Sequence, residues 1–180
     1  MTVAVAFLRA INLGPTRKFP AAAVKAATEA VGATDVATWL NTGNVRFTTS
    51  LRSRERIEAA LEAAYAEAAG FEVPTVVLSP AEVVATAADA VRLGREYPGV
   101  GMQYVSILKN EPDPVAAAAF GERWRGPDHA VVLGRTVHLL LAARDNYHGS
   151  SLANDTVERA FGVATNRNAR VIATLAERWG

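Results

Sequence analysis

The order of short apolar runs and amphipathic segments in residues 3–78 is the feature that most limits how this chain can fold. Short β-branched apolar runs predict buried strands, and apolar residues at helical spacing predict helices. In chain order they predict strand, helix, strand, strand, helix and strand, over Val3–Leu8, Pro20–Gly32, Val36–Leu40, Val45–Thr49, Ser53–Ala69 and Val73–Leu78. This is the order of the ferredoxin-like fold, in which two interleaved βαβ units share one antiparallel sheet.

The predicted strand order also indicates which loops meet. Right-handed crossovers place the third strand between the first two, antiparallel to both. The ends of the first two strands and the start of the third then share one edge of the sheet. We therefore expect six residues from two distant loops to converge there: Arg9, Asn12, Asn41, Thr42, Gly43 and Asn44.

The second half predicts a smaller α+β structure. A helix begins at Ser79-Pro80, with Glu82 three residues after the cap, and continues to about Leu93. The glycines and the proline of residues 94–100 predict a linker, so we expect a ferredoxin-like domain over 1–93 and a second α+β domain over 101–180. The second domain reads as a copy of the first that lacks its last strand and ends in helices.

Composition excludes several classes of protein. The 19 basic and 18 acidic residues nearly cancel, which argues against nucleic acid as a partner, and no apolar run is long enough to span a bilayer. The absence of cysteine excludes disulfides, thiol nucleophiles and iron–sulfur clusters. We expect a cytoplasmic protein with no membrane partner, and the sequence predicts neither a cofactor nor an oligomeric state.

Three motifs resemble one known family. They are the residues of Leu8–Gly14, of Thr38–Phe47 and of Ala164–Asn168. In this order and spacing they are similar to an uncharacterised bacterial family, domain of unknown function 1697. The resemblance covers nearly the whole chain and implies an α+β fold with a ferredoxin-like N-terminal half. It implies no reaction, because none is established for that family.

The chain departs from the family pattern at five positions. In the first loop, Ala10 and Pro15 stand where glycine is usual, and in the hairpin Thr42 stands where serine is usual. After the third motif, Ala169 replaces a tryptophan and Arg170 replaces a neutral polar residue. The changes in the first loop raise the question whether a site that needs a closely approached backbone is altered in this protein.

Seven residues that match the family pattern are the candidate ligand-binding residues: Arg9, Asn12, Gly14, Gly43, Asn44, Arg167 and Asn168. The planar guanidinium of arginine suits bidentate contact with a carboxylate or phosphate. We therefore expect a small anionic ligand, such as a nucleotide or a phosphorylated or carboxylate metabolite, in a cleft between the two halves. The alternative is that the same residues tie loops and helix ends to the backbone and bind no ligand.

Whether the chain is an enzyme stays open at this point, because no acid–base pair stands at a suitable spacing. Asp145, His148 and Ser150 lie within one loop, which seldom aligns a nucleophile, a base and an orienting group. His129 and His138 form a diagonal pair on a predicted hairpin without a third ligand. We therefore predict no metal site.

Overall fold

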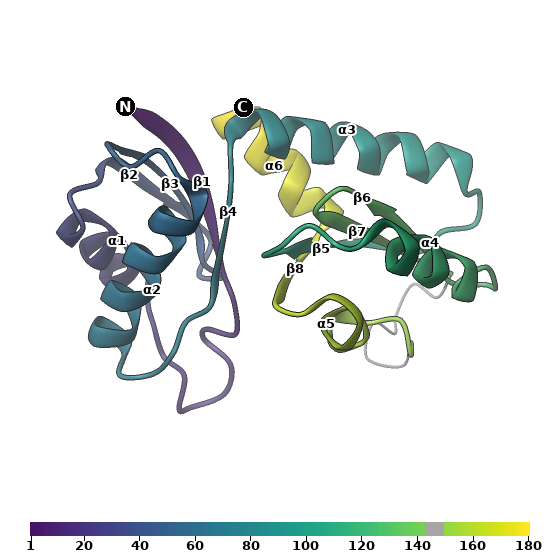
Figure 1. Ribbon diagram of the computed structural model, residues 1–180, viewed down its shortest axis with the longest axis horizontal. Helices are drawn as coiled ribbons and strands as arrows, with labels where there is room; N and C mark the ends of the chain where they lie inside the picture. The colour runs from purple at the N-terminus through teal and green to yellow at the C-terminus, as the bar shows by residue number, and fades with distance from the viewer. Residues whose placement is uncertain (143–149) are drawn as a thin grey trace. The chain divides into compact units, whose positions relative to one another are not determined.

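The structure is a computed structural model that describes residues 1–142 and 150–180. Its contacts divide the chain into two compact units, Met1–Val83 with Trp179–Gly180, and Val84–Arg178. Each unit has its own four-stranded antiparallel sheet (Figure 1). Within the described residues, no helix has both the length and the apolar character needed to cross a membrane.

The first unit has the predicted ferredoxin-like order. Its elements are β1 (Thr2–Leu8), α1 (Ala21–Ala30), β2 (Thr34–Trp39), β3 (Asn44–Thr49), α2 (Arg54–Ala69) and β4 (Thr75–Leu78). The strands lie in the order β2-β3-β1-β4, and β3 pairs antiparallel with both β1 and β2. The strand order inferred from right-handed crossovers is therefore confirmed.

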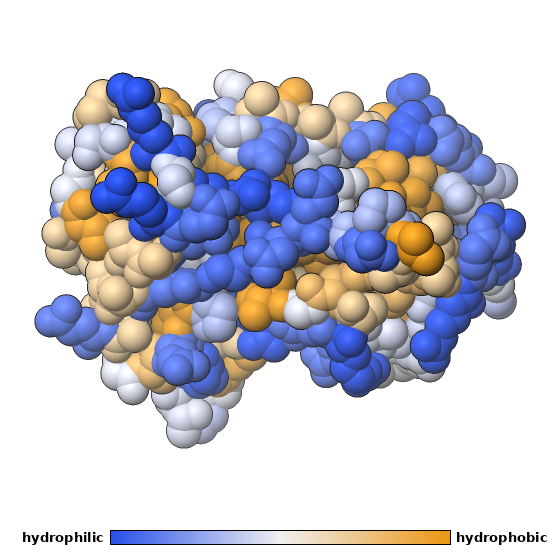
Figure 2. Space-filling view, viewed as in Figure 1, coloured by the Kyte–Doolittle hydropathy of each residue, from blue (hydrophilic) through white to orange (hydrophobic). Residues whose placement is uncertain are grey.

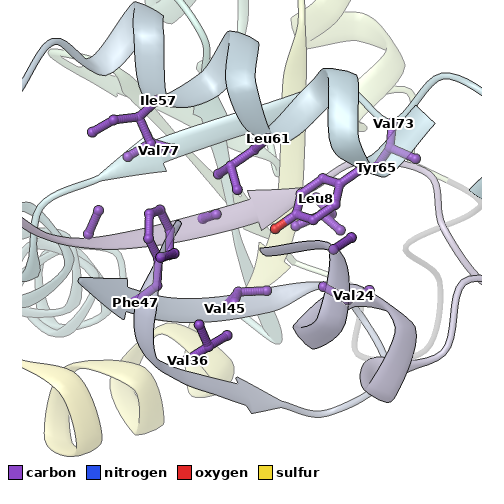
Figure 3. Packing of buried hydrophobic residues seen from close by; sticks show 14 of the residues in the cluster. Leu8, Val24, Val36, Val45, Phe47, Ile57, Leu61, Tyr65, Val73 and Val77 are labelled. Carbon is purple, nitrogen blue, oxygen red and sulfur yellow. The ribbon is translucent and has the colours of Figure 1, made fainter. Parts of the chain in front are cut away.

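One face of this sheet packs against α1 and α2 to form the core (Figure 3). Tyr65 of α2 is fully buried, with its ring edge-on to Phe19 at a centroid distance of 5.6 Å. Its hydroxyl shares a hydrogen bond of 2.7 Å with Thr28 Oγ1 of α1. Burial raises the pKa of Tyr65 to about 12. The tyrosine therefore contributes apolar area to the core while its polar tip keeps a partner.

Local sequence determines where the helices begin and end. Ser53 Oγ accepts the Arg56 N–H at the start of α2, and Gly70 adopts a φ of 75° at its end. The helix α3 (Pro80–Glu96) begins with reciprocal bonds, from Ser79 N to Glu82 Oε2 at 2.7 Å and from Glu82 N to Ser79 Oγ at 3.2 Å. This is the capping box that the sequence predicts.

The second unit contains the strand that the sequence reading omitted. Its elements after α3 are β5 (Met102–Leu108), α4 (Pro114–Arg123), β6 (His129–Leu133), β7 (Thr136–Leu141), α5 (Asn154–Phe161), β8 (Ala164–Asn168) and α6 (Ala169–Trp179). The prediction that this half lacks its last strand is wrong, because β8 pairs antiparallel with β5. The sequence of β8 is mostly polar, and strand prediction relies on apolar and β-branched residues, so β8 gave no strand signal.

The two sheets correspond in detail. The order β6-β7-β5-β8 repeats the order β2-β3-β1-β4. Leu8 N donates to Gly43 O at 2.8 Å, and at the matching place Leu108 N donates to Arg135 O at 2.8 Å. The second unit is thus a complete βαββαβ copy of the first in topology.

The helix α3 joins the two sheets in sequence and extends beyond its predicted end near Leu93. The division by contacts falls at Val83 and Val84, inside α3, whereas the sequence predicts a linker at 94–100. One reason is that Gln103 Nε2 of β5 donates to Ala90 O of α3 at 3.0 Å, which holds this part of the helix beside the second sheet. The division into domains 1–93 and 101–180 stays a prediction.

Candidate functional site

Asn12 is the residue around which the first loop folds. Its Nδ2 donates to Phe19 O at 3.0 Å and to Asn41 O at 2.7 Å, and its Oδ1 accepts the Phe19 N–H at 3.0 Å. Its backbone has a φ of 56°, a left-handed conformation that asparagine tolerates. Both amide donors are thus used within the protein. Asn12 fastens the loop after β1 to the hairpin turn, and the two loops meet as the strand order predicts.

The hairpin turn between β2 and β3 also uses its polar groups internally. Asn44 is fully buried, and its Nδ2 donates to Trp39 O and to Thr42 Oγ1, each at 3.0 Å. Gly43 has a φ of 75°, and a Cβ placed on it would lie 2.6 Å from Leu8 Cβ. Glycine is therefore required here by backbone conformation and by the closeness of β1.

Arg17 has a structural role and lies outside the predicted set of ligand-binding residues. Its Nε donates to Ala10 O at 2.6 Å and its Nη2 to Glu72 O at 2.8 Å. Its guanidinium carbon lies 4.4 Å from the centre of the Phe71 ring. Ala10, which stands where the resembling family has glycine, has a φ of 55°. The family glycine therefore corresponds to a left-handed backbone position, which here carries alanine.

Arg9 and Gly14 complete the predicted set in the first unit. Arg9 is half-buried, and its backbone N–H donates to Pro74 O at 2.8 Å. Gly14 has a φ of 62° at a place where a Cβ would meet no atom within 4 Å. Gly14 is therefore explained by its turn conformation.

The hollow beside the hairpin turn is too narrow to hold a water molecule. Its walls come from the loop, the turn, α1 and the neighbouring strands: Ile11, Phe19, Ala21, Val24, Thr38, Leu40, Asn41, Gly43, Asn44 and Val45. The structure thus brings the two motifs of the first unit together, and at the hollow beside them it offers no space for a ligand.

Arg167 and Asn168 lie on β8 in the second unit. Arg167 is buried, and its Nη1 donates to Thr165 Oγ1 and to Asn166 O, each at 2.8 Å. Burial lowers the pKa of the Arg167 guanidinium to about 10. Asn168 Oδ1 accepts the Arg170 N–H at 2.9 Å and so caps α6. Arg167 belongs to the interior, whereas Asn168 lies at the surface end of the same strand.

A cavity of about 580 Å³ lies beside Asn168, within the second unit. It is lined by the start of α6, the end of α3 and the start of β5: Gly94, Val100, Gly101, Met102, Gln103, Asn168, Ala169 and Arg170. Arg170 is exposed, and within the described ranges its guanidinium has no hydrogen-bond or carboxylate partner. Arg170 was identified from the sequence only as a departure from the family pattern and not as a site residue.

The histidines form no metal site in the part of the chain that the structure describes. His138 is fully buried on β7, and its Nδ1 has no hydrogen-bond partner there. Burial lowers the pKa of His138 to about 4, so its imidazole is neutral at physiological pH. His129 instead stacks at a tilt on Tyr97, with ring centres 4.8 Å apart. Asp145 and His148 lie outside the described residues.

Comparisons with known proteins agree with this fold. A solved structure, described as that of the conserved bacterial protein SP0830 from Streptococcus pneumoniae, is similar with a TM-score of 0.77 and 18% sequence identity. The similarity covers 99% of this chain and 98% of that chain, and at this identity it establishes the fold alone. No curated protein matches the chain.

A family model described as "Protein of unknown function (DUF1697)" matches residues 1–138. The matched segment contains the first two motifs, in the loop after β1 and in the β2–β3 hairpin, and ends before the third, on β8. It covers well over half of the 180 residues. The resemblance inferred from the motifs is thereby confirmed, and the chain belongs to the DUF1697 family of proteins of unknown function.

Proposed function

We propose that this protein binds a small anionic ligand, such as a phosphorylated or carboxylate metabolite, in the cavity of the second unit. The observation that carries the proposal concerns Arg170, which lines a cavity of about 580 Å³ and whose guanidinium has no hydrogen-bond or carboxylate partner among the described residues. That volume lies within the range typical of small-molecule sites, about 300–1,000 Å³. A guanidinium offers a planar set of donors that matches carboxylate and phosphate oxygens.

The other polar groups on the cavity wall fit an anion with a polar body. Gln103 lines the cavity, and its Nε2 donates to Ala90 O. Asn168 is fixed by its bond to the Arg170 backbone N–H, so both residues are preorganised. The apolar groups of Val100 and Met102 line the remaining wall and would contact a carbon skeleton. A ligand with one anionic end and a partly apolar body is therefore favoured.

Binding is favoured over catalysis because the described part of the cavity wall offers no acid–base pair. Among the described residues, those that line the cavity include no aspartate, glutamate, histidine or lysine. General acid–base chemistry needs such a group within hydrogen-bond reach of the reacting atoms. The proposal further places the protein in the cytoplasm, supported by its cysteine-free composition.

The test is a thermal-shift and calorimetric screen with inorganic phosphate, AMP and citrate as probes. A ligand at one hundred times its dissociation constant adds about 2.7 kcal/mol to stability, which raises the melting temperature measurably. We expect a shift for the wild type that Arg170→Ala loses. Arg159→Ala is the matched control, because Arg159 is also an exposed arginine of the second unit, on α5. An equal shift in wild type and Arg170→Ala, or no shift across the screen, would refute the proposal.

A further inference from the structure

The outer edge of β4 is closed by side chains of its own unit. The strand lies at one end of its sheet, so backbone N–H groups on its outer side have no neighbouring strand. Thr75 N donates to Glu62 Oε1 at 2.8 Å, and Val77 N donates to Glu58 Oε1 at 2.9 Å. The two carboxylates stand one helical turn apart on α2 and so match alternate residues of the strand. They occupy the donors that another chain would need for pairing.

Two further edges are closed in comparable ways. At β8 the Ala164 N–H donates to Glu158 Oε1 of α5 at 3.2 Å. At β2 the pairing with β3 shifts its register between Thr34 and Ala37, and Asp35 within that shift has a φ of 52°. A bulge of this kind bends an edge strand away from regular pairing.

In the described part of the chain, the outer edge of β6 has neither a bulge nor a glutamate side chain that accepts its backbone N–H groups. The strand reads His-Ala-Val-Val-Leu and pairs with β7 in unbroken register. Leu133 and Thr136 flank the two-residue turn and form a hydrogen-bonded pair. Hydrogen-bonded and non-hydrogen-bonded pairs alternate along an antiparallel ladder, so the backbone N–H and C=O groups of Ala130 and Val132 point away from β7. In agreement, Ala130 N donates outward to Trp124 O at 3.4 Å. Within the described ranges no partner occupies the outward groups of Val132.

A groove of about 460 Å³ lies along this open edge. One wall is the Val131–Val132 stretch of β6, and the other is the side of α4 that presents Ala117, Ala118 and Gly121. Trp124 also lines the groove, and its buried indole Nε1 has no acceptor among the described atoms. Next to the groove, α4 exposes Val115, which is 77% exposed. Figure 2 shows apolar surface over the part of the molecule where Figure 1 draws α4.

We infer that this groove binds an extended peptide segment of a partner protein, which adds to the sheet as a strand beside β6. The outward N–H and C=O of Val132 are complementary to the backbone of any extended chain, whatever its sequence. Alternate side chains of such a segment project to one side, so apolar ones would fill the groove between β6 and α4.

The size of the open edge favours a peptide over a second copy of this chain. Because Trp124 O already takes the Ala130 N–H, pairing of two β6 edges would use little more than the groups of Val132. Such a contact is far smaller than the roughly 1,200 Å² buried in stable interfaces. A peptide instead occupies the edge and the groove together.

The test uses the full chain and a phage-displayed library of random nine-residue peptides. Selected peptides are synthesised, and their affinities are measured by fluorescence anisotropy. Val132→Pro removes the outward donor at an edge position where proline is tolerated, and Val132→Ala is the control that keeps it. Ala118→Glu places a charge in the groove from an exposed helical position. Circular dichroism verifies the fold of each variant.

We expect selected peptides with apolar residues at alternate positions, and a loss of about tenfold or more in affinity for Val132→Pro and for Ala118→Glu. Val132→Ala should bind within a few-fold of the wild type. A folded Val132→Pro that binds with unchanged affinity would overturn strand addition. A library that yields no binder would also overturn the inference, as would a dimer of the wild type in solution that Val132→Pro converts to monomer.

Discussion

Gly43→Ala should be among the most destabilising small substitutions in the first unit, for two separable reasons. Gly43 has a φ of 75°, and a left-handed backbone costs a residue with a Cβ about 1–2 kcal/mol. The added Cβ would also lie 2.6 Å from Leu8 Cβ, well inside the separation of about 3.5–4.0 Å that carbon atoms prefer.

This overlap cannot be relieved by a side-chain rotation, because Leu8 Cβ is fixed to the backbone of β1. The strand and the turn must separate, which lengthens the bond of 2.8 Å from Leu8 N to Gly43 O. Overpacking of this kind typically costs about 1–3 kcal/mol. The sum predicts that Gly43→Ala lowers the free energy of unfolding by about 2–5 kcal/mol.

Gly70→Ala is the matched control. Gly70 ends α2 with the same φ of 75°, but a Cβ there would meet no atom within 4 Å. Gly70→Ala should therefore lower the free energy of unfolding only by the cost of the left-handed backbone, about 1–2 kcal/mol. Urea unfolding followed by circular dichroism gives both values, and hydrogen exchange of the Leu8 amide locates the effect at the turn. If Gly43→Ala and Gly70→Ala lower the free energy of unfolding equally, the predicted overlap with Leu8 Cβ does not destabilise the protein.

Three further perturbations test the structure. Ala10→Gly should stabilise the protein by about 0.5–1 kcal/mol in urea unfolding, because relief of the left-handed strain at a φ of 55° exceeds the added entropy of the unfolded chain. His138 has a pKa near 4 when folded against 6.5 when unfolded, so the unfolded state binds the proton more readily. Stability should fall by up to about 3 kcal/mol as the pH drops from about 6.5 to 4, and His138→Gln should flatten that dependence. Glu58→Ala leaves the Val77 N–H without its acceptor and should cost about 1–3 kcal/mol in urea unfolding, whereas Glu58→Gln keeps an acceptor oxygen and should cost less.

Elements with strong local signals were predictable from the sequence. Ser53 and Gly70 mark the ends of α2, and the pair Ser79 and Glu82 marks the start of α3, because capping depends on residues within one turn. The strand order of the first unit also followed from the element order, since the handedness of crossovers leaves few arrangements.

The strand β8 was not predictable by the same reasoning. Its residues are Ala-Thr-Asn-Arg-Asn, and their polar side chains are accommodated by partners in three dimensions. Asn166 Nδ2, for example, donates to Ser106 Oγ at 3.0 Å across to β5. Pairing with a neighbouring strand therefore overrides the low strand propensity of this segment.

For the candidate residues too, the sequence predicted their positions better than their interactions. The sequence by itself determined that the loop after β1 meets the β2–β3 turn, because strand order is set by local patterns and by chain handedness. Only the tertiary structure decided what the residues do. Asn12 donates to backbone carbonyls, and Asn44 donates to Trp39 O and to Thr42 Oγ1. Arg167 is buried, whereas Arg170 lines a cavity and its guanidinium has no partner among the described residues. The physical reason is that burial and hydrogen-bond partners depend on atoms distant in the chain, whereas turns and caps depend on near neighbours.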